Sequence, residues 1–346
     1  MKVAVIFGGK STENYVSRLS ATSVIKNMNK EKYEIVMIGI TKDGKWYHYI
    51  GDVCDLSKED WVNHVEPSVN GIATLADPTI DVIFPVLHGT NGEDGTVQGL
   101  FELLDKPYVG CGVLASAVSM DKAYTKIICE KEGIPQCKKC AFERYEIEND
   151  PEGCAEKAVA NLGFPIFVKP SNAGSSFGVS KAKDKDALIE ALKLAAQYDI
   201  RVLAEEFIDG REIECAVLGN WDLEVDIPGE LVAANEFYDY DAKYFNNQSR
   251  TEVPADLTEA QREEVCGYAK RVFRCLDCKG LSRVDFFLER STGRFLFNEI
   301  NTLPGFTNIS MYSMMWGASG LAYADLLDKL IALAFENYEA HKRNYF

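Results

Sequence analysis

Residues 166–179, IFVKPSNAGSSFGV, pass from an apolar run into a lysine, a proline and then a loop of glycines and serines. The apolar run predicts a buried strand that ends at Lys169. Backbone N–H groups of such a loop can cradle a phosphate whose charge the lysine neutralises. The order GxxxxGK[ST] of a P-loop is missing. On its own, the stretch therefore fits either a phosphate site or a solvated surface hairpin.

Size and charge limit the class of protein. The chain has 346 residues, 47% of them hydrophobic, and a formal net charge of −16. An acidic chain is repelled by polyphosphate backbones, so we expect no nucleic-acid partner. No apolar run approaches the roughly 20 residues that cross a bilayer. The start MKVAVIFGG is too short for a signal peptide, so we expect a cytoplasmic protein without membrane insertion.

The chain has ten cysteines, and two CxxC pairs, CKKC (137–140) and CLDC (275–278), raise the question of a zinc site. The first pair lies in a segment that alternates like a strand, which sends its two thiols to opposite faces. We therefore expect reduced thiols, as is usual in the cytosol.

The first third of the chain predicts alternating strands and helices. KVAVIF (2–7), YEIVMIGIT (33–41) and DVIFPVL (81–87) are nearly continuous apolar runs, as in strands buried on both faces. This pattern predicts a parallel sheet with crossover helices. A single helix is expected over 112–132, because Gly133 and Pro135 supply a stop.

The rest of the chain predicts smaller, more antiparallel units. Helices are expected near 152–162, 185–197 and 321–337, and Thr258 with Gln261 forms a capping box for a helix to about 276. Strands are expected at 139–144, 165–169, 201–208, 212–219 and 223–227, with a hairpin formed by 282–289 and 294–301. Residues 236–256 show no usable period, which is typical of a lid over a site.

The predicted hairpin carries oxygen ligands. Glu299 and Asn301 are two residues apart and share a face of their strand, and the short turn brings Asp285 opposite them. Two carboxylates and an amide oxygen suit magnesium bound with phosphates. The alternative is a polar sheet face paired with basic side chains. The acidic segment AEEFIDGREIE (204–214) likewise fits either adenosine recognition or solvated surface charge.

These features occur in an order that resembles the ATP-grasp enzymes, and specifically the D-alanine–D-alanine ligases, over essentially the whole chain. The matching motifs are HGTNGEDGTVQG (88–99), SMDK (119–122), KPSNAGSSFGV (169–179), FYDYDAKY (237–244) and NEINTLPGFT (298–307). The resemblance implies an α/β fold with α+β parts, the ATP-grasp fold. Its expected divisions are an N-terminal parallel-sheet domain (1–112), a central subdomain (113–204) and a C-terminal subdomain (205–346) with the lid at 236–256.

The resemblance also implies a reaction. ATP and two magnesium ions, which manganese can replace, serve the ligation of two D-alanines for peptidoglycan and cell-wall synthesis, in a cytoplasmic homodimer. The carboxylate of the first D-alanine attacks the γ-phosphate to give an acylphosphate. The amine of the second D-alanine then displaces phosphate through a tetrahedral intermediate.

Roles for single residues follow from the same resemblance. Those implied for ATP are Lys122, Lys169 and Ser176 at the phosphates, Glu205, Glu206 and Ile208 at the adenine, and Glu212 at the ribose. Those implied for metal are Asp285, Glu299 and Asn301, and those for the substrates are His88, Lys243, Ser310 and Met311. The implied catalytic set is Glu13, Ser175, Tyr244, Arg283 and Gly305.

Within the catalytic set, Arg283 and the N–H of Gly305 resemble an oxyanion hole. Glu13 takes the first ammonium and hydrogen-bonds with the loop serine and the lid tyrosine. Without the family, Glu13 fits simple helix-start stabilisation, His88 a core or turn histidine, and Ser310 an ordinary loop hydroxyl.

One motif departs from the family pattern. ENYVS (13–17) stands where the family often has EHEVS, so Asn14 and Tyr15 alter the polar surround expected at the first substrate site. Tyr244 argues against a D-lactate-type ligase and leaves the vancomycin-resistance D-alanine–D-serine ligases as the alternative. A non-catalytic nucleotide-binding regulator would be expected to lose metal ligands or Lys243. A dinucleotide-dependent dehydrogenase would need GxGxxG after the first strand, which the chain lacks.

Overall fold

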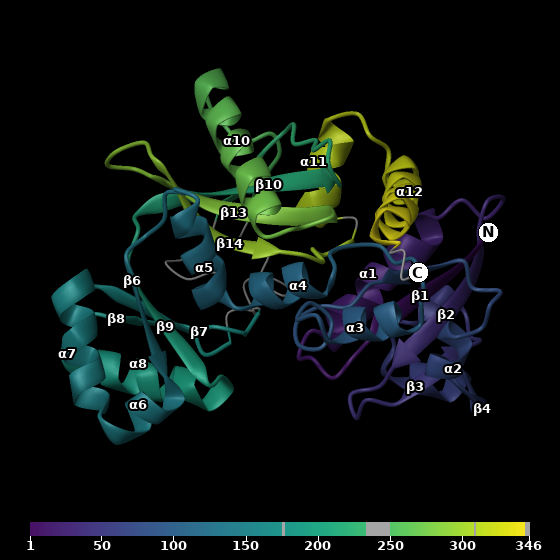
Figure 1. Cartoon of the computed structure of the whole chain (residues 1–346), viewed down its shortest axis with the longest axis horizontal. Coiled ribbons are helices and arrows are strands. Elements are labelled where there is room, and N and C mark those ends of the chain that lie inside the picture. Colours follow the sequence, from purple (N-terminus) through teal and green to yellow (C-terminus); the bar gives the residue numbers. More distant parts are fainter. Residues whose placement is uncertain (175–176, 233–249, 308, 343–346) are drawn as a thin grey trace.

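A computed structural model describes residues 1–174, 177–232, 250–307 and 309–342. Within these residues the strands form three sheets, each with helices packed on it (Figure 1). The described helices include none long and apolar enough to cross a membrane. All ten cysteines are free thiols.

The N-terminal sheet has the order β4-β3-β2-β1-β5. Its strands are β1 (Lys2–Gly8), β2 (Glu34–Ile40), β3 (Trp46–Tyr49), β4 (Val65–Asn70) and β5 (Val82–Pro85). Strand β1 runs parallel to β2 and β5, but β2–β3 and β3–β4 are antiparallel. The sheet is therefore mixed, and the prediction of a parallel sheet is wrong for this edge. The five residues 41–45 between β2 and β3 are too few for a crossover, which needs a dozen or more.

Short helices surround this sheet and lead away from it. They are α1 (Asn14–Asn27), η1 (Val53–Asp55), η2 (Glu59–His64), α2 (Gly71–Leu75) and α3 (Thr96–Leu103). The single helix expected over 112–132 is in fact two, α4 (Val113–Met120) and α5 (Lys122–Lys131). The break falls at Asp121, which is extended (φ −84°, ψ 97°) and caps α5 through its side chain.

The central sheet has the order β6-β9-β7-β8, and its pairs are antiparallel. Its strands are β6 (Lys139–Glu143), β7 (Ile166–Pro170), β8 (Ser180–Ala182) and β9 (Arg201–Glu206). The helices α6 (Arg144–Asn149), α7 (Pro151–Leu162) and α8 (Lys185–Tyr198) cover one face of it and share its core (Figure 1). Lys169 therefore lies on β7, just before the glycine and serine loop that joins β7 to β8.

The third sheet is antiparallel, in the order β12-β11-β10-β13-β14. Its strands are β10 (Gly210–Gly219), β11 (Gly229–Val232), β12 (Arg250–Glu252), β13 (Gly280–Glu289) and β14 (Phe295–Asn301). Helix α10 (Glu259–Cys275) packs on it and begins with the predicted capping box, which is confirmed. The strand predicted over 223–227 is wrong, because only Glu224 forms a bridge, to Leu218.

The last two helices join the sheets together. Helix α11 (Met311–Ala318) and helix α12 (Tyr323–His341) contribute to one core with β1, β5 and α1. Figure 1 shows α12 beside α1, although about 300 residues of chain separate them. The core of the N-terminal sheet is thus completed by the C-terminal part of the chain. The division at 112 and 204 stays a prediction; strand β9 of the central sheet runs on to Glu206.

Candidate active site

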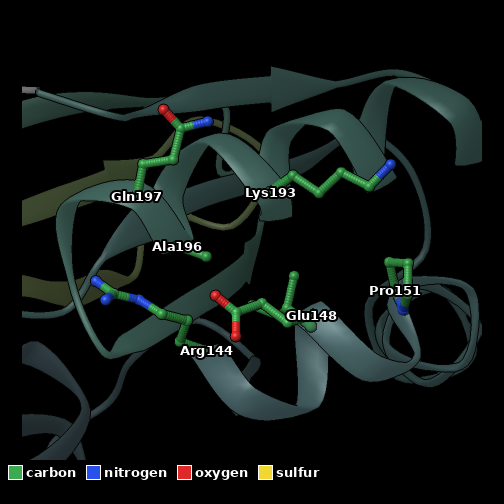
Figure 2. Close-up of a pocket in the computed structure, with 7 residues that line it drawn as sticks. Arg144, Glu148, Pro151, Lys193, Ala196 and Gln197 are labelled. Carbon is green, nitrogen blue, oxygen red and sulfur yellow. The ribbon is translucent and has the colours of Figure 1, made fainter.

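A cleft of about 740 Å³ lies where the three sheets approach one another. The expected site residues that line it are Glu13, Lys122, Lys169, Glu205, Glu206, Ile208, Glu212, Arg283, Asp285, Glu299 and Asn301. A second hollow of about 510 Å³ lies among α6, α7 and α8. Figure 2 shows Arg144 and Glu148 on one side of that hollow and Lys193 and Gln197 on the other. No expected site residue lines the second hollow, so the larger cleft is the candidate site.

The oxygen ligands meet on the hairpin of β13 and β14. Asp285 is directly opposite Glu299, and Arg283 is opposite Asn301. The Asn301 amide donates from Nδ2 to Oδ2 of Asp285 at 3.0 Å. The predicted juxtaposition is confirmed. Among the described residues no group of three or more His, Cys, Asp and Glu side chains could hold a metal ion, so the candidate set is two carboxylates and an amide. That set matches the oxygen donors that magnesium prefers.

Lys122 links this hairpin to the loop between β7 and β8, the candidate phosphate loop. Its Nζ donates to the carbonyl of Ala173 at 2.9 Å and lies 3.5 Å from Oε2 of Glu299. It is the first residue of α5 and directly follows the capping Asp121. The helix break therefore decides where this ammonium points, between the loop and the candidate metal ligands.

Arg283 is held by two acids. Its Nε and Nη2 donate to the two carboxylate oxygens of Asp285 at 2.8 and 2.7 Å, and its Nε lies 3.0 Å from Oε2 of Glu214. Burial works against its charge, but Asp285 and Glu214 outweigh burial and hold the pKa of Arg283 well above its ordinary value. The guanidinium is therefore a fixed positive charge beside the candidate metal ligands.

Glu205 lies between two lysines at the end of the cleft formed by the central sheet. Its Oε2 is 2.5 Å from Nζ of Lys169, and its Oε1 is 2.7 Å from Nζ of Lys126. Burial alone raises the pKa of Glu205, but the two ammonium groups outweigh it and place that pKa well below the usual range. Its neighbour Glu206 accepts a hydrogen bond from the Lys138 N–H at 2.7 Å.

Sequence reasoning missed Lys126. Its signal was present in the sequence, because DKAYTK places Lys126 four residues after Lys122 on the same helix face. It was passed over because a helix lysine is normally solvated, whereas this one is 0% exposed.

A second pair of acids lines the cleft near α1. Glu13 stands just before α1, and a Cβ built on Gly174 of the phosphate loop would come within 2.9 Å of its Oε2. Glu93 accepts from the N–H groups of Gly89 at 2.7 Å and Leu303 at 3.1 Å. Burial and the charge of Glu13 raise the pKa of Glu93 to about 7. Glu93 was also missed, although it lies within the 88–99 motif.

His88 faces protein groups and does not line the cleft. Its Nδ1 is 3.0 Å from the carbonyl of Leu303, and its Nε2 is 3.2 Å from Oγ of Ser20. The same Oγ accepts from the Phe306 N–H at 3.3 Å. These bonds fix the loop after β14 that carries Gly305, so the described contacts of His88 position this loop.

Gly305, Ser310 and Met311 lie together at the start of α11 and also outside the cleft lining. A Cβ on Gly305 would come 3.0 Å from Oγ of Ser310, so the two are in contact. That Oγ accepts from the N–H of Thr307 at 2.9 Å.

Comparison with known proteins gives the family. A model described as the D-ala D-ala ligase N-terminus matches residues 2–111, and one described as the D-ala D-ala ligase C-terminus matches residues 128–332. The chain belongs to the D-alanine–D-alanine ligase family. Curated D-alanine–D-alanine ligases of Acetivibrio thermocellus and Ruminiclostridium cellulolyticum are 52% and 53% identical to it, over 99% of this chain and 98% of each relative.

A solved structure of the same fold is the VanG D-Ala:D-Ser ligase from Enterococcus faecalis. It superposes with a TM-score of 0.86 at 40% identity, over 96% of this chain and 99% of that one. Membership of the D-alanine–D-alanine ligase family and the ATP-grasp fold, both expected from the motifs, are thereby confirmed.

The departure from the ligase family pattern at 14 and 15 has a structural explanation. Asn14 is 2% exposed, and its Nδ2 donates to the carbonyls of Gly9 at 2.7 Å and Ile40 at 3.4 Å. Its Oδ1 accepts from Nε of Arg18 at 3.1 Å. Tyr15 lies over the Arg18 guanidinium at 5.4 Å. Neither side chain lines the cleft: Asn14 belongs to the buried packing behind Glu13, whereas Tyr15 is exposed.

Four residues expected from the ligase family lie outside the described residues. They are Ser175, Ser176, Lys243 and Tyr244. Most of the predicted lid over 236–256 lies outside as well. Their roles stay predictions.

Proposed function

We propose that this protein joins two D-alanines into D-alanyl-D-alanine with ATP, supplying a precursor of peptidoglycan. The observation that carries the proposal is the cleft itself, which brings Lys122 and Lys169 together with the oxygen donors of the β13–β14 hairpin. Lysines and hard oxygen ligands facing one space are what phosphoryl transfer requires, since the reaction depends on alignment and charge neutralisation.

In this proposal Asp285, Glu299 and Asn301 hold two magnesium ions, or manganese in their place. When bound, the ions neutralise and align the phosphates. Lys122 and Lys169 add positive charge at the phosphates, the latter beside the glycine and serine loop. The segment around Glu205, Ile208 and Glu212 takes the adenosine, because it lines the same cleft.

Glu13 holds the ammonium of the first D-alanine in the proposed reaction. Its carboxylate lies against Gly174, so the amino acid bound there is close to the phosphate loop. The substrate carboxylate attacks the γ-phosphate, ADP leaves, and an acylphosphate forms. This intermediate hydrolyses in water, which is why a lid over 236–256 belongs to the proposal.

The amine of the second D-alanine then attacks the acyl carbon and displaces phosphate. Arg283 and the N–H of Gly305 donate to the oxyanion of the tetrahedral intermediate. A guanidinium has five N–H donors, so Arg283 can hold Asp285 and still face substrate. Ser310, in contact with Gly305, takes the second carboxylate together with Lys243.

The experiment is a product analysis. The protein is incubated with ATP, magnesium and D-alanine, alone or with added D-serine or D-lactate; phosphate release is followed and products are identified by mass. We expect D-alanyl-D-alanine, ADP and phosphate. A mixed dipeptide that dominates at modest D-serine would favour the D-alanine–D-serine activity named for the structural neighbour. Absence of phosphate release with every amino acid would favour a nucleotide-binding regulator.

A variant pair tests the metal assignment. Glu299→Ala should abolish turnover and leave the fold intact. Glu289→Ala, at the other end of the same hairpin and outside the cleft lining, should behave like the parent. Retained turnover in Glu299→Ala would rule out the assignment. A homodimer and a cytoplasmic location, both implied by the resemblance, complete the proposal; sedimentation of the purified protein tests the first.

A further inference from the structure

Lys126 is a fully buried lysine beside the cleft. It lies on α5, one turn after Lys122, and its side chain is 0% exposed. Its Nζ is 2.7 Å from Oε1 of Glu205, 3.4 Å from the carbonyl of Phe297 and 3.7 Å from Sγ of Cys137. The same ammonium lies 5.6 Å from the centre of the Phe297 ring. A buried ammonium is stable only when such partners replace the water it has lost.

Glu205 connects this lysine to the cleft. Its other oxygen, Oε2, is 2.5 Å from Nζ of Lys169, which lines the cleft and is the last residue but one of strand β7. The side chain of Glu205 is itself only 7% exposed. One carboxylate is therefore shared by two ammonium groups, one inside the protein and one facing the proposed phosphate site.

The summed charge of Lys126, Glu205 and Lys169 affects what the cleft presents to an anion near Lys169. Lys126, Glu205 and Lys169 sum to +1. Without Lys126, the carboxylate and Lys169 sum to zero, and the ammonium in the cleft is neutralised by its own partner. The loss matters here because the whole chain carries −16 and repels a triphosphate unless charge is placed locally.

Lys126 is charged in this setting. Burial works against its ammonium, but Glu205 outweighs burial and keeps the pKa of Lys126 above its ordinary value. Its backbone is fixed as well, since Gln136 donates from Nε2 to the Lys126 carbonyl at 2.8 Å.

We propose that Lys126 is a positioning residue for nucleotide binding: it compensates the charge of Glu205, so that Lys169 meets the ATP phosphates with a net positive charge and in a fixed place. The inference rests on the proposed function in that the anion is the nucleotide phosphate. A purely structural Lys126 would instead support the fold without regard to the charge of the ligand.

The test measures binding of AMP, ADP and ATP, each with magnesium, by calorimetry. One unit charge roughly 8 Å from a phosphate, at an effective dielectric constant of about 20, changes binding about 30-fold. Lys126→Met should therefore weaken ATP binding by about 30-fold, ADP binding by less and AMP binding least. The KM for D-alanine should change less than about 3-fold, because Lys126 lies behind Glu205, which lines the proposed nucleotide end of the cleft.

A charge-restoring variant separates electrostatics from structure. Lys126→Met with Glu205→Gln returns the summed charge to +1, and glutamine keeps an amide oxygen where the carboxylate stood. This double variant should recover most of the lost preference for ATP over AMP, a ratio in which any change in the adenine contact of residue 205 cancels. Lys126→Met leaves Glu205 paired with Lys169 and should therefore fold, and in the double variant Lys169 keeps Oδ1 of Asn298 at 3.4 Å. Lys139→Met is the matched control, since Lys139 pairs with Glu130 at 2.7 Å outside the cleft lining.

Three results would overturn the inference. The first is a folded Lys126→Met protein that binds ATP within about 3-fold of the parent. The second is equally weakened binding of AMP and ATP by that variant. The third is a double variant whose preference for ATP over AMP stays as low as that of the single variant. Failure of the proposed function would look different, because the parent protein itself would then bind no ATP, or would bind ATP and form no D-alanyl-D-alanine, whatever residue stands at 126.

Discussion

Asp121 ties the start of α5 to the central sheet, and its removal should loosen the cleft. Its carboxylate accepts hydrogen bonds from the N–H groups of Ala123 (3.1 Å) and Tyr124 (3.3 Å), Oγ of Ser171 (2.5 Å), Nδ2 of Asn172 (3.3 Å) and Nη1 of Arg201 (2.6 Å). The residue is 8% exposed. Substitution to alanine removes a helix cap, a partly buried ion pair and a buried hydroxyl contact at once.

The size of the effect follows from these parts. The cap contributes about 1 kcal/mol. The hydrogen bond from Ser171 contributes about 1 kcal/mol more. The Arg201 side chain is 19% exposed and keeps Glu143 as a partner, so losing Asp121 costs about 1–2 kcal/mol there, less than for a fully buried pair. Asp121→Ala should therefore lower the free energy of unfolding by about 3–4 kcal/mol.

Asp121→Asn is the informative comparison. Asparagine keeps an oxygen for the cap and for Ser171 but turns an NH₂ toward Arg201, so about 1–2 kcal/mol should be lost. Urea denaturation gives the free energies, and hydrogen exchange of the α5 amides shows whether the loosening is local. Because Lys122 follows Asp121 directly, the KM for ATP should rise in both variants. An alanine variant within 1 kcal/mol of the parent, or an asparagine variant as unstable as the alanine one, would refute the reasoning.

Three further predictions concern residues in the N-terminal part of the chain. Burial and the charge of Glu13 raise the pKa of Glu93 to about 7. Between pH 4.5 and 7 the folded state therefore binds more protons than the unfolded state, and the free energy of unfolding falls as pH rises. Glu93→Gln should flatten this dependence of the unfolding free energy on pH, measured by urea denaturation at several pH values. Ser20→Ala should lower kcat about 10-fold with little change in the KM for ATP, because the loop that carries Gly305, the proposed oxyanion donor, loses the bond between Ser20 and Phe306. An unchanged kcat in steady-state assays would contradict this. Arg18 is 0% exposed and donates to the carbonyls of Leu56 and Lys58. Arg18→Met should therefore lower the free energy of unfolding by about 3 kcal/mol and leave the KM for ATP unchanged. Thermal unfolding tests the loss of stability, and ATP titration in the activity assay tests the KM.

Local patterns predicted the residue pairing in the β13–β14 hairpin well. Side chains alternate along a strand, so Glu299 and Asn301 lie on one face. The short turn fixes the register of the two strands, and with it the residue that Asp285 pairs with. The capping box of Thr258 and Gln261 is equally local and is also present. Features of this kind depend on neighbours within a few residues, which the sequence displays directly.

Features decided by distant partners were not predictable in this way. The extended backbone at Asp121 is stabilised by Ser171 and Arg201, which are 50 and 80 residues away in the chain. The burial of Lys126, on helix α5, depends on Glu205, which lies on strand β9, 79 residues further along the chain. The predicted strand over 223–227 has the right composition, yet only Glu224 finds a pairing partner there. A strand forms only beside another strand with an unpaired edge, and the composition of a segment does not reveal whether such an edge is available.

The core shared between β1 and the last helices has a consequence for how the chain is made. Phe306, Tyr312 and Leu327 pack with Phe7 and Val24 in that core. On the ribosome, strands β1 to β5 emerge about 220 residues before these partners do. At a synthesis rate of about 5–20 residues per second, one apolar face of the newly formed sheet remains exposed for roughly 10–45 s. Nascent chains truncated before α11 should therefore be bound by chaperones or aggregate. Release of the complete chain allows the last helices to cover the apolar face of the sheet.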